Sequence, residues 1–530
     1  MKTRLSSPLQ TTRPPGAMRG AATTWATLLV ALLLLLLGGK TTSAQTINGL
    51  DYTVNADNTV TITGSDCGSG VVVIPPMIAG LPVTSIGAGA FFDCTVLTSV
   101  TIPNSVTNIG DYAFEGCSGL TAILVDALNG AYSGVGGVLF NRKQTLLVAY
   151  PGGKLGDYIV PSRVTSIGVN AFFSCFGLTS VTIPSSVRFI GAHAFESCSG
   201  LTSVTIPSNV TAIGAYAFSS CSGLTSLTIG TTPGSVTAIG VDAFEGCSGL
   251  TSVTIPSSVT SIGARAFSGC YGLTAILVDA LNPAYSGVGG VLFNRNQSLV
   301  VAYPAGKSGA YIVPSSVTAI GDSAFFHCSG LTSVTIPSSA TLIGDNAFFG
   351  CSGLTGFIIP SSVTAIGANA FFSCNGLTSV TIPSSVIAIG VGAFAYCPNL
   401  RAAQFGGNAL TGSSSVFDST PATVFYLPGT TGWSSSFGGA PTAVWQLPAP
   451  VILPPRANTT NGFGFTISWA TNATIVVEAS STLASSSWSP ISTNTISFSS
   501  GPGVAFGGWL HFNDPQWTSY PNRFYRVRQQ

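Results

Sequence analysis

The segment A-F-x-x-C occurs eleven times in this 530-residue chain, and every copy follows I-G-x-x. The cysteines of these copies are Cys94, Cys117, Cys175, Cys198, Cys221, Cys247, Cys270, Cys328, Cys351, Cys374 and Cys397. Seven of the ten steps between them are 23 residues, one is 26 and two are 58. A fixed period of this length is typical of stacked repeats, in which no unit can bury its apolar face alone. The chain is predicted to fold as a solenoid, and its function is expected on a surface.

The first 44 residues have the features of a secretory signal peptide. Basic residues precede an apolar run at 28–37, and small residues at 42–44 stand just before Gln45. Such a segment is removed on export, so we expect the mature chain to be secreted or held at the cell surface. An uncleaved membrane anchor is the alternative, although the run at 26–37 is short for a span. No later run has spanning length, so no integral membrane span is expected after removal of the signal.

Composition and motifs argue against several classes of function. Only 7% of the residues are charged and the net charge is +1, whereas ordinary soluble domains have roughly 25% charged residues. A nucleic acid would require a surplus of Lys and Arg on one face, so no nucleic-acid partner is expected. The sequence lacks H-E-x-x-H, G-x-S-x-G, C-x-x-C and P-loop spacings, which are the patterns of common metal, nucleophile and phosphate sites. We therefore predict no catalytic residues, no cofactor and no metal ligands.

The titratable residues do not form a recognisable cluster. His193 lies beside an A-F pair, His327 precedes Cys328, and His511 lies near the C-terminus; each is interpreted as a surface or edge position. Acidic residues fall near the A-F segments at one or two per repeat. Calcium sites need denser acids, so these side chains are interpreted as a solvated face.

Twelve cysteines in an exported protein would usually suggest disulfides. Eleven of them occupy one repeat position, so neighbouring thiols would stack about 4.8 Å apart, as in paired strands. Their side chains would point in parallel and not toward each other. We therefore expect a buried column of reduced thiols that act as small hydrophobic groups. Cys67 stands outside this register and has no obvious partner.

Each repeat is predicted to be mostly extended. In the stretch L-T-S-V-T-I-P, as at Leu250–Pro256, the apolar residues alternate as a strand requires. Proline ends this strand because it cannot donate to the ladder. The following S-S-V-T-S-I-G can form a second short strand, and A-F-x-x-C has room for one helical turn, with its phenylalanine filling the core. The fold class is thus mainly β, with short helical turns.

These motifs resemble those of BspA-like leucine-rich repeat proteins over roughly residues 80–402. Two further segments, Gly137–Pro151 and Gly290–Pro304, also recur in that family and lie 153 residues apart, which indicates duplication of a block. The resemblance implies a curved right-handed solenoid and, in some members, surface adhesion or binding of host or matrix proteins. We expect hairpins turned at Asn141-Arg142 and Asn294-Arg295, within insertions near 125–160 and 278–313.

The regions outside the repeats complete the predicted organisation. Residues 45–79 are assigned to an N-terminal cap, 80–402 to the solenoid and 403–446 to a C-terminal cap. A proline-rich linker at 447–455 precedes short alternating strands at 456–530. Their length and alternation predict a small β-sandwich, which loosely resembles an immunoglobulin or fibronectin type III module.

The candidate binding face consists of hydroxyl side chains at the outward strand positions, which we expect to align in columns on the concave side. They are Ser180, Thr182, Ser203, Thr205, Ser226, Thr228, Ser252, Thr254, Ser333, Thr335, Ser379 and Thr381. Such residues also simply suit exposed strand positions. Aromatic residues in the inserted segments could support binding, because loops commonly carry it; these are Tyr132, Tyr150, Tyr285 and Tyr303.

The sequence thus predicts a non-catalytic adhesion protein that binds an extracellular protein or a glycan. One alternative is a hydrolase whose activity lies in the C-terminal module, with Asp514 and His511 as the residues to test. Another is a hydroxyl array that binds ordered water or ice. Leu124, Leu277 and Ile358 interrupt that array at its own positions, which weakens the last alternative.

Overall fold

The structure is a computed structural model that describes residues 45–445, apart from 231–235, 413 and 428–429. Beyond residue 445 it describes 451–453, 463–468, 474–482, 488–495, 509–514, 519 and 524–529. The predicted signal peptide at 1–44 and most of the predicted linker lie outside the described residues. Within the described part of the chain, none of the elements is a helix long and apolar enough to cross a membrane.

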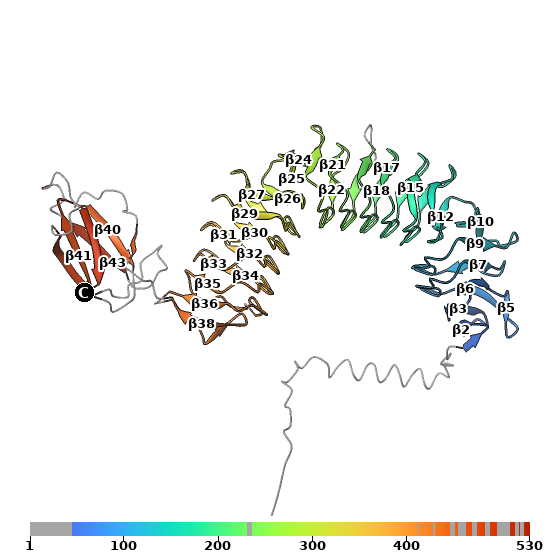
Figure 1. Cartoon of the computed structure of the whole chain (residues 1–530), viewed down its shortest axis with the longest axis horizontal. Helices are drawn as coiled ribbons and strands as arrows, with labels where there is room; N and C mark the ends of the chain where they lie inside the picture. Colours follow the sequence, from blue (N-terminus) through green and yellow to red (C-terminus); the bar gives the residue numbers. More distant parts are fainter. Residues whose placement is uncertain are drawn as a thin grey trace, which may run out of the picture.

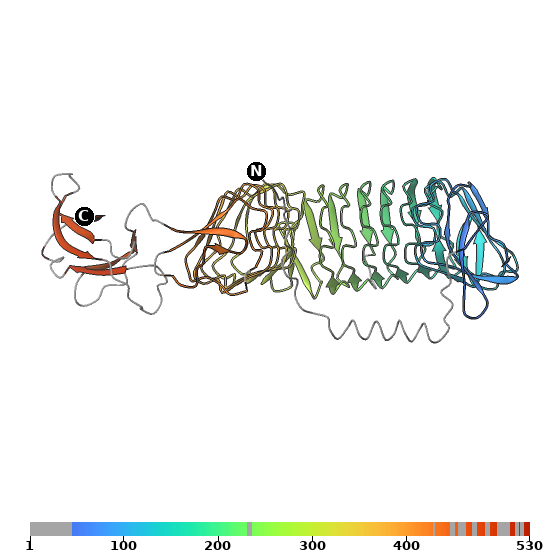
Figure 2. The same cartoon turned by 90° about the horizontal axis from the view of Figure 1, so that it is seen from below.

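The repeats stack into an arc of successive coils (Figure 1). Seen from below, in Figure 2, the coils lie side by side without crossing. Each regular coil contributes one longer and one shorter strand to parallel sheets, and the described residues contain no α-helix. The predicted mainly β solenoid is confirmed.

The longer strands carry the S-V-T-I motif and alternate exposed and buried side chains, as in β17 (Ser203–Ile206). Those in the regular solenoid are β7 (Ser99–Ile102), β9 (Ala122–Val125), β13 (Gly156–Ile159), β15 (Leu178–Thr182), β17, β19 (Ser226–Ile229), β21 (Ser252–Ile255), β23 (Ala275–Val278), β27 (Gly309–Ile312), β29 (Leu331–Thr335), β31 (Gly356–Phe357) and β33 (Ser379–Ile382). They form several short parallel sheets, which break between β9 and β13, between β19 and β21, between β23 and β27, and between β31 and β33, where only an isolated bridge remains.

The shorter strands lie just before the I-G glycine and form longer sheets. They are β8 (Asn108–Ile109), β14 (Ser166–Ile167), β16 (Phe189–Ile190), β18 (Ala212–Ile213), β20 (Ala238–Ile239), β22 (Ser261–Ile262), β28 (Ala319–Ile320), β30 (Leu342–Ile343), β32 (Ala365–Ile366) and β34 (Ala388–Ile389). One sheet runs without interruption from β14 to β22 and another from β28 to β34.

Each inserted segment forms a three-stranded antiparallel meander. The first contains β10 (Tyr132–Val135), β11 (Val138–Asn141) and β12 (Leu146–Ala149), and the second contains β24 (Tyr285–Val288), β25 (Val291–Asn294) and β26 (Leu299–Ala302). The predicted turn after Asn141 joins β11 to β12, so that hairpin is confirmed. A further hairpin precedes it and turns at Gly136 and Gly137, whose φ angles are 58° and 80°. Strands β12 and β26 then take the place of a shorter strand, since they pair in parallel with β14 and β28.

The A-F-x-x-C segment is not helical, so the prediction of a helical turn is wrong. Two residues per copy have positive φ: the one before the alanine, such as Asn170 at 56°, and the one before the cysteine, such as Ser174 at 55°. This left-handed conformation prevents a continuous i to i−4 ladder. The backbone amides donate to the next coil instead: the amide of Asn170 donates to the Ala192 carbonyl at 3.1 Å, and that of Phe172 to the Ala194 carbonyl at 2.7 Å. The segment, here called the A-F turn, therefore forms a further ladder between coils.

The phenylalanines of the A-F turns fill the core as a continuous stack within each run of coils. The ring centroids of Phe172 and Phe195 are 4.5 Å apart, and those of Phe195 and Phe218 are 4.9 Å apart. Stacked aromatic pairs stabilise a core beyond the apolar area that they bury. Each coil is thus held to the next by both rings and backbone.

Ten of the eleven cysteines of the repeat are free and buried, as predicted for them. Their thiols also donate hydrogen bonds: Sγ of Cys198 lies 3.0 Å from the carbonyl oxygen of Phe172 in the preceding coil. Cys94 is the exception, because it forms a disulfide with Cys67. The prediction that Cys67 lacks a partner is therefore wrong. The first coil has no preceding A-F turn, so the Cys94 side chain meets the N-terminal segment instead.

Both ends of the solenoid consist of β-strands. At the N-terminus lie β1 (Gln45–Ile47), β2 (Leu50–Val54), β3 (Val60–Ser65), β4 (Val71–Val73), β5 (Met77–Ile78) and β6 (Leu81–Ile86); β3 already pairs in parallel with β6, and β4 with β7. At the other end, β35 (Ala402–Phe405), β36 (Thr423–Tyr426) and β38 (Ala440–Val444) continue the parallel order, and β37 (Ser436–Phe437) pairs with β38. The ring of Phe417 stacks on that of Phe394, so the coil pattern persists into the region predicted as a cap.

The C-terminal strands form two three-stranded antiparallel sheets, in the orders β39-β40-β43 and β42-β41-β44. They are β39 (Val451–Leu453), β40 (Phe463–Ser468), β41 (Thr474–Ser480), β42 (Ser489–Thr495), β43 (Trp509–Asp514) and β44 (Phe524–Gln529). The buried Glu478 carboxylate binds both Arg526 and Arg528. Packing of the two sheets as an immunoglobulin-like sandwich stays a prediction.

Candidate functional site

The predicted hydroxyl residues lie at the outward positions of the longer strands. Ser180 is half-buried and the other eleven are exposed. The strand register aligns Ser203 with Ser226 and Thr205 with Thr228, so columns form across neighbouring coils. Because their neighbours at i±1 point into the core, these side chains are free for contact with a partner.

The threonine column is interrupted by aliphatic side chains. Ile159 pairs with Thr182, and Ile312 with Thr335; Ile358 forms a bridge with Thr381. Ile312 and Ile358 are 74% and 82% exposed, so neither serves the core. Sequence analysis treated such residues only as defects in a hydroxyl array. In the structure they make the outward face of β27–β33 partly apolar.

This face lies on the outer side of the arc, so the prediction that it is concave is wrong. In Figure 1, β17, β21, β29 and β33 lie toward the outer edge, and β18, β22, β30 and β34 lie nearer to the centre. The inner side must be the one on which coils approach most closely. A Cβ added to Gly214, after β18, would lie 2.5 Å from the Ala192 nitrogen, which no side chain can tolerate. The glycines after the shorter strands therefore permit this close approach, as do those before the longer strands, such as Gly223, whose added Cβ would lie 2.3 Å from the Ser199 carbonyl oxygen. The repeat pattern in the sequence does not indicate the direction of curvature.

The tyrosines of the inserted segments are structural. Tyr150 and Tyr303 are only 6% exposed and fill the core position of the phenylalanines. Tyr132 and Tyr285 are half-buried, and their hydroxyl oxygens accept hydrogen bonds from the amides of Ile109 and Ile262. These four rings do not form the exposed binding surface that the sequence suggested.

The A-F turn ladder is interrupted where each insertion enters, at two places that we call the first and second junctions. At the first, the amides of Tyr112, Phe114 and Gly116 donate to no acceptor among the described residues. The inserted segment places only Ala149, Tyr150 and Pro151 opposite them, which is too short to form an A-F turn. Of that stretch the Tyr150 amide alone joins the ladder, through the Ala171 carbonyl at 2.6 Å.

The core is interrupted at the same places. One aromatic stack ends at Phe114, a second runs from Tyr150 to Phe267, and a third begins at Tyr303. The buried side chains likewise fall into three separate clusters, which divide near Leu139 and near Leu292 within the insertions. The sequence signals for these breaks are the two 58-residue steps between cysteines and the recurring segments Gly137–Pro151 and Gly290–Pro304.

A cavity of about 90 Å³ opens at the first junction, lined by Tyr112–Glu115, Val148–Tyr150, Val169, Asn170 and Phe173 among others. Three polar atoms at this site are buried without a hydrogen-bond partner: both side-chain amide atoms of Asn170 and Oε2 of Glu115. Burial raises the pKa of the Glu115 carboxyl, and the negative charge of Glu196 adds to that shift. The site offers several donors and acceptors but disfavours negative charge.

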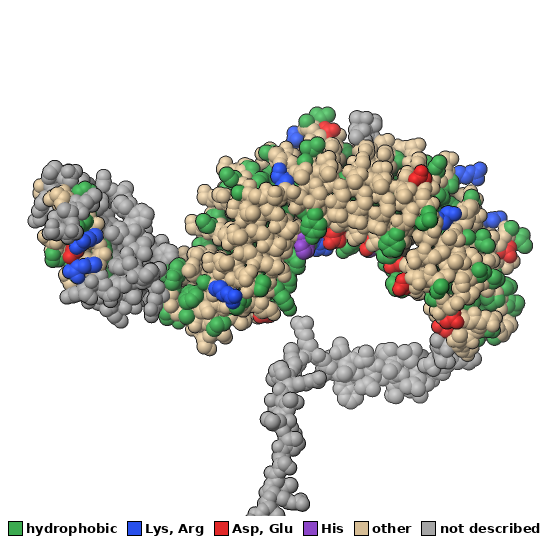
Figure 3. Space-filling model, viewed as in Figure 1, with side chains coloured by type: hydrophobic (Ala, Val, Ile, Leu, Met, Phe, Trp, Pro, Cys, Tyr) green, Lys and Arg blue, Asp and Glu red, His purple; other side chains and the backbone are tan. Residues whose placement is uncertain are grey.

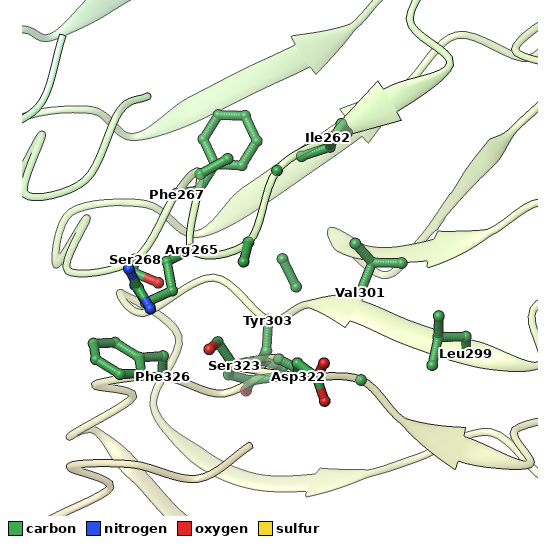
Figure 4. Close-up of a pocket in the computed structure, with 16 residues that line it drawn as sticks. Ile262, Arg265, Phe267, Ser268, Leu299, Val301, Tyr303, Asp322, Ser323 and Phe326 are labelled. Carbon is green, nitrogen blue, oxygen red and sulfur yellow. The ribbon is translucent and has the colours of Figure 1, made fainter. Parts of the chain in front are cut away.

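The second junction is the duplicate of the first and holds a cavity of about 190 Å³. Its free amides are those of Arg265, Phe267 and Gly269. Figure 4 shows Phe267 on one wall, Tyr303 on the other, and Arg265 extending toward Phe326. The Arg265 guanidinium also binds Asp242 at 2.6 Å. Thus the second cavity is larger and is lined by more apolar side chains, and an anchored cation crosses part of it.

The remaining titratable groups are engaged separately. His193 binds Glu196, and burial lowers the pKa of His327. Acidic side chains gather on the inner edge of the arc in Figure 3, but within the described residues no three His, Cys, Asp or Glu side chains could hold a metal. At the C-terminus, Tyr525 donates to Asp514, whereas the side chain of His511 lies outside the described residues. The hydrolase alternative therefore gains no assembled acid, base and nucleophile from the described chain.

Comparison with known proteins decides the family. A profile described as the BspA type leucine rich repeat region matches residues 76–133, 149–276 and 308–423, in six copies. The chain belongs to the BspA-type leucine-rich repeat family. The matched residues are more than half of the chain, and the gaps between them coincide with the two meanders. No curated protein matches the chain.

Several solved structures of bacterial leucine-rich repeat proteins are similar to this family member. A leucine-rich cell surface protein from Faecalibacterium prausnitzii is 30% identical, and the match covers 70% of this chain and 97% of that one, with a TM-score of 0.45. The pneumococcal vaccine antigen PcpA is 19% identical over 77% of this chain and 100% of its own, with a TM-score of 0.43. A leucine-rich repeat protein from Eubacterium ventriosum is 21% identical over 76% and 96%, with a TM-score of 0.42.

Proposed function

We propose that this BspA-type protein is exported to the cell surface and binds an extracellular protein through the outer face of its longer strands, without catalysis. The observation that carries the proposal is the exposure of Ile312 and Ile358 among threonines on β27–β33. Exposed aliphatic side chains grouped with polar ones on a rigid surface are typical of protein contact sites. The basic and apolar features of residues 1–44 support export.

On the proposed face, a protein ligand is favoured over a glycan because no aromatic ring lies among its outward residues. Sugar rings usually stack on an exposed aromatic face. The outward positions of the longer strands from β15 to β33 carry Ser, Thr, Ala, Gly, Leu or Ile and no aromatic ring. The uncharged outer strands also offer no cation for an acidic polysaccharide. A glycan remains the second outcome of the test below.

An ice- or water-binding array is disfavoured by the interruptions of the threonine column. Matching an ice lattice would require hydroxyl groups at every coil. Leu277 follows Thr254 in the register, and Ile159 precedes Thr182. The uninterrupted run of threonines therefore spans only the coils of β15, β17, β19 and β21.

The proposal is tested by binding of residues 45–530 and of residues 45–445 to arrays of extracellular matrix proteins and polysaccharides. Retention of saturable binding to one protein by the shorter chain would place the site on the solenoid. Ile312→Lys with Ile358→Lys should then reduce affinity at least tenfold, because two exposed contact side chains would become charged. Ile387→Lys is the matched control, since Ile387 is 75% exposed but precedes the shorter strand β34. Equal binding by all variants, or none by either chain, would contradict the proposal.

A further inference from the structure

The first junction lacks the acceptors of the A-F turn ladder, which can be identified by comparison with the uninterrupted coils. There, the amides of His193, Phe195 and Ser197 donate to the carbonyls of Ala215, Ala217 and Ser219, at 2.9, 2.7 and 2.8 Å. The corresponding amides of Tyr112, Phe114 and Gly116 have no acceptor within the described chain. Tyr112 is exposed and Phe114 and Gly116 are half-buried, so these amides can be reached by a partner that supplies the acceptors. The complement of this row is a polypeptide backbone that presents alternate carbonyl groups.

The opposite wall supplies polar groups of both kinds. Asn170 lines the cavity, and its Nδ2 and Oδ1 atoms are both buried without a partner. An asparagine side chain can donate to a carbonyl and accept from an N–H at once, so it can bind one peptide group through two hydrogen bonds. Its positive φ of 56° explains why asparagine suits the backbone here, but it does not explain two unsatisfied buried atoms.

The charges of the site exclude an anionic occupant. Burial and the charge of Glu196 already raise the pKa of Glu115, and Asp111 lies on the same wall of the cavity. A phosphate or carboxylate would add negative charge to this acidic surrounding, without a Lys or Arg among the lining residues. A neutral peptide group provides the required acceptors at no such cost.

We propose that the first junction binds an extended, uncharged polypeptide segment of a partner protein through its main chain, as a replacement for the missing A-F turn. The segment accepts hydrogen bonds from the amides of Tyr112, Phe114 and Gly116, and one of its peptide groups pairs with Asn170. This is recognition by strand addition, applied to the A-F turn ladder in place of a sheet edge. The inference deepens the proposed function, on which it rests for the origin of the segment, but it concerns a different surface from the outer strand face.

The probe is a fluorescein-labelled peptide with the sequence of residues 213–222, carrying Cys221→Ser. It contains the A-F turn that covers the corresponding amides in an uninterrupted coil. Binding to residues 45–530 is measured by fluorescence anisotropy, with the all-D peptide as a control for non-specific association. The L peptide should bind saturably below ~1 mM, a range typical of a few main-chain contacts, and the D peptide should not.

Two matched pairs of variants locate the binding. Val169→Trp should block the cavity and weaken binding at least tenfold, because Val169 lines its mouth and is 48% exposed; Val241→Trp places the same residue in an uninterrupted coil and should have no effect. Asn170→Gly preserves the positive φ and should weaken binding about tenfold through the loss of two hydrogen bonds. Asn369→Gly at the same repeat position is its control.

The possible results separate this proposal from the preceding one. Absence of saturable peptide binding, or binding unchanged by both Val169→Trp and Asn170→Gly, would overturn the inference about the junction. Matrix binding that survives Val169→Trp but is lost with the outer-face variants would leave the proposed function intact. Peptide binding that follows the expected pattern would support the junction even if no matrix protein bound the outer face.

Discussion

At the scale of single residues, the repeated cysteine and glycine each satisfy a geometric requirement of coil stacking. The thiol of Cys221 donates to the carbonyl of Phe195 at 3.1 Å, which explains why a small donor is retained at this buried position. The glycine after each shorter strand, such as Gly214, permits close contact between coils. Sequence analysis predicted that the thiols are buried but not that they donate hydrogen bonds. The repeat pattern does not indicate which carbonyl of the preceding coil lies next to each thiol.

Thiol titration tests the column. Burial raises the pKa of Cys397 to about 11 and that of Cys117 to about 12, so the folded chain should react negligibly with a thiol reagent at pH 8. Unfolding in guanidinium without reductant should release ten thiols, since Cys67 and Cys94 are paired. Twelve thiols would contradict the disulfide, and fewer than ten would contradict the reduced column.

Substitution of a glycine after a shorter strand tests how closely neighbouring coils must approach. Gly214→Ala should destabilise the chain by about 2 kcal/mol, because its Cβ would overlap a backbone that cannot move aside. Gly356→Ala is the control, since no atom lies within 4 Å of the added carbon. Urea unfolding of both variants provides the measurement. Equal stability of the two variants would show that the inner side has room to spare.

The buried carboxyl at the first junction should make stability depend on pH. The pKa of Glu115 is raised in the folded state, so ionisation costs stability as the pH rises through that value, and the cost is absent at low pH. Glu115→Gln should therefore raise Tm at pH 7 and leave it nearly unchanged at pH 4. Thermal unfolding at the two pH values would refute this if the gain were larger in acid.

At the scale of elements, the strands were predictable and their connections were less so. The alternation in L-x-x-V-x-I fixes which side chains of β17 and β21 face inward, and proline marks where those strands end. The A-F turn was misread as helical because its length allows one helical turn, whereas positive φ at residues such as Asn170 and Ser174 is not encoded by a constant residue type. The direction of curvature depends on contacts between coils, which no single repeat reveals.

One tyrosine hydroxyl in each meander closes the end of the preceding shorter-strand sheet, in addition to the backbone pairing of β12 with β14 and of β26 with β28. Tyr132 and Tyr285 accept from the amides of Ile109 and Ile262, where the shorter-strand sheet would otherwise have an open edge. Tyr285→Phe should cost about 1 kcal/mol, the net contribution of one such hydrogen bond. Urea unfolding, with Tyr271→Phe at an exposed position as the control, measures that loss; an unchanged stability would mean that water replaces the hydroxyl.

At the scale of the whole molecule, the chain is a duplicated block whose coils interact mainly with their neighbours. Stability of such arrays is approximately a sum of repeat and interface contributions. The two insertions divide the core into three clusters. Packing between neighbouring coils is therefore interrupted at two points along the molecule. Each point holds a cavity, of about 90 Å³ at the first junction and about 190 Å³ at the second, as expected for a block duplicated together with its insertion.

Deletion of one block tests this modular organisation. Removal of residues 138–290 joins Gly137 to Val291, which preserves the local sequence because Gly290 and Gly137 are equivalent. The shortened chain should fold cooperatively with a far-UV spectrum of the same shape. Five of the ten free cysteines lie in the deleted block, so five thiols should be released on unfolding. A chain that fails to fold would contradict the additive description.

The central claim is that the A-F turn ladder is continuous except at the two junctions. Hydrogen–deuterium exchange of the free chain, resolved to single amides by NMR, tests this claim most directly. The amides of Tyr112, Phe114 and Gly116, and those of Arg265, Phe267 and Gly269, should exchange at least about a hundredfold faster than the corresponding amides of His193, Phe195 and Ser197, which are hydrogen-bonded. Equal protection at all these positions would show that the ladder is closed at the junctions, and would contradict the account.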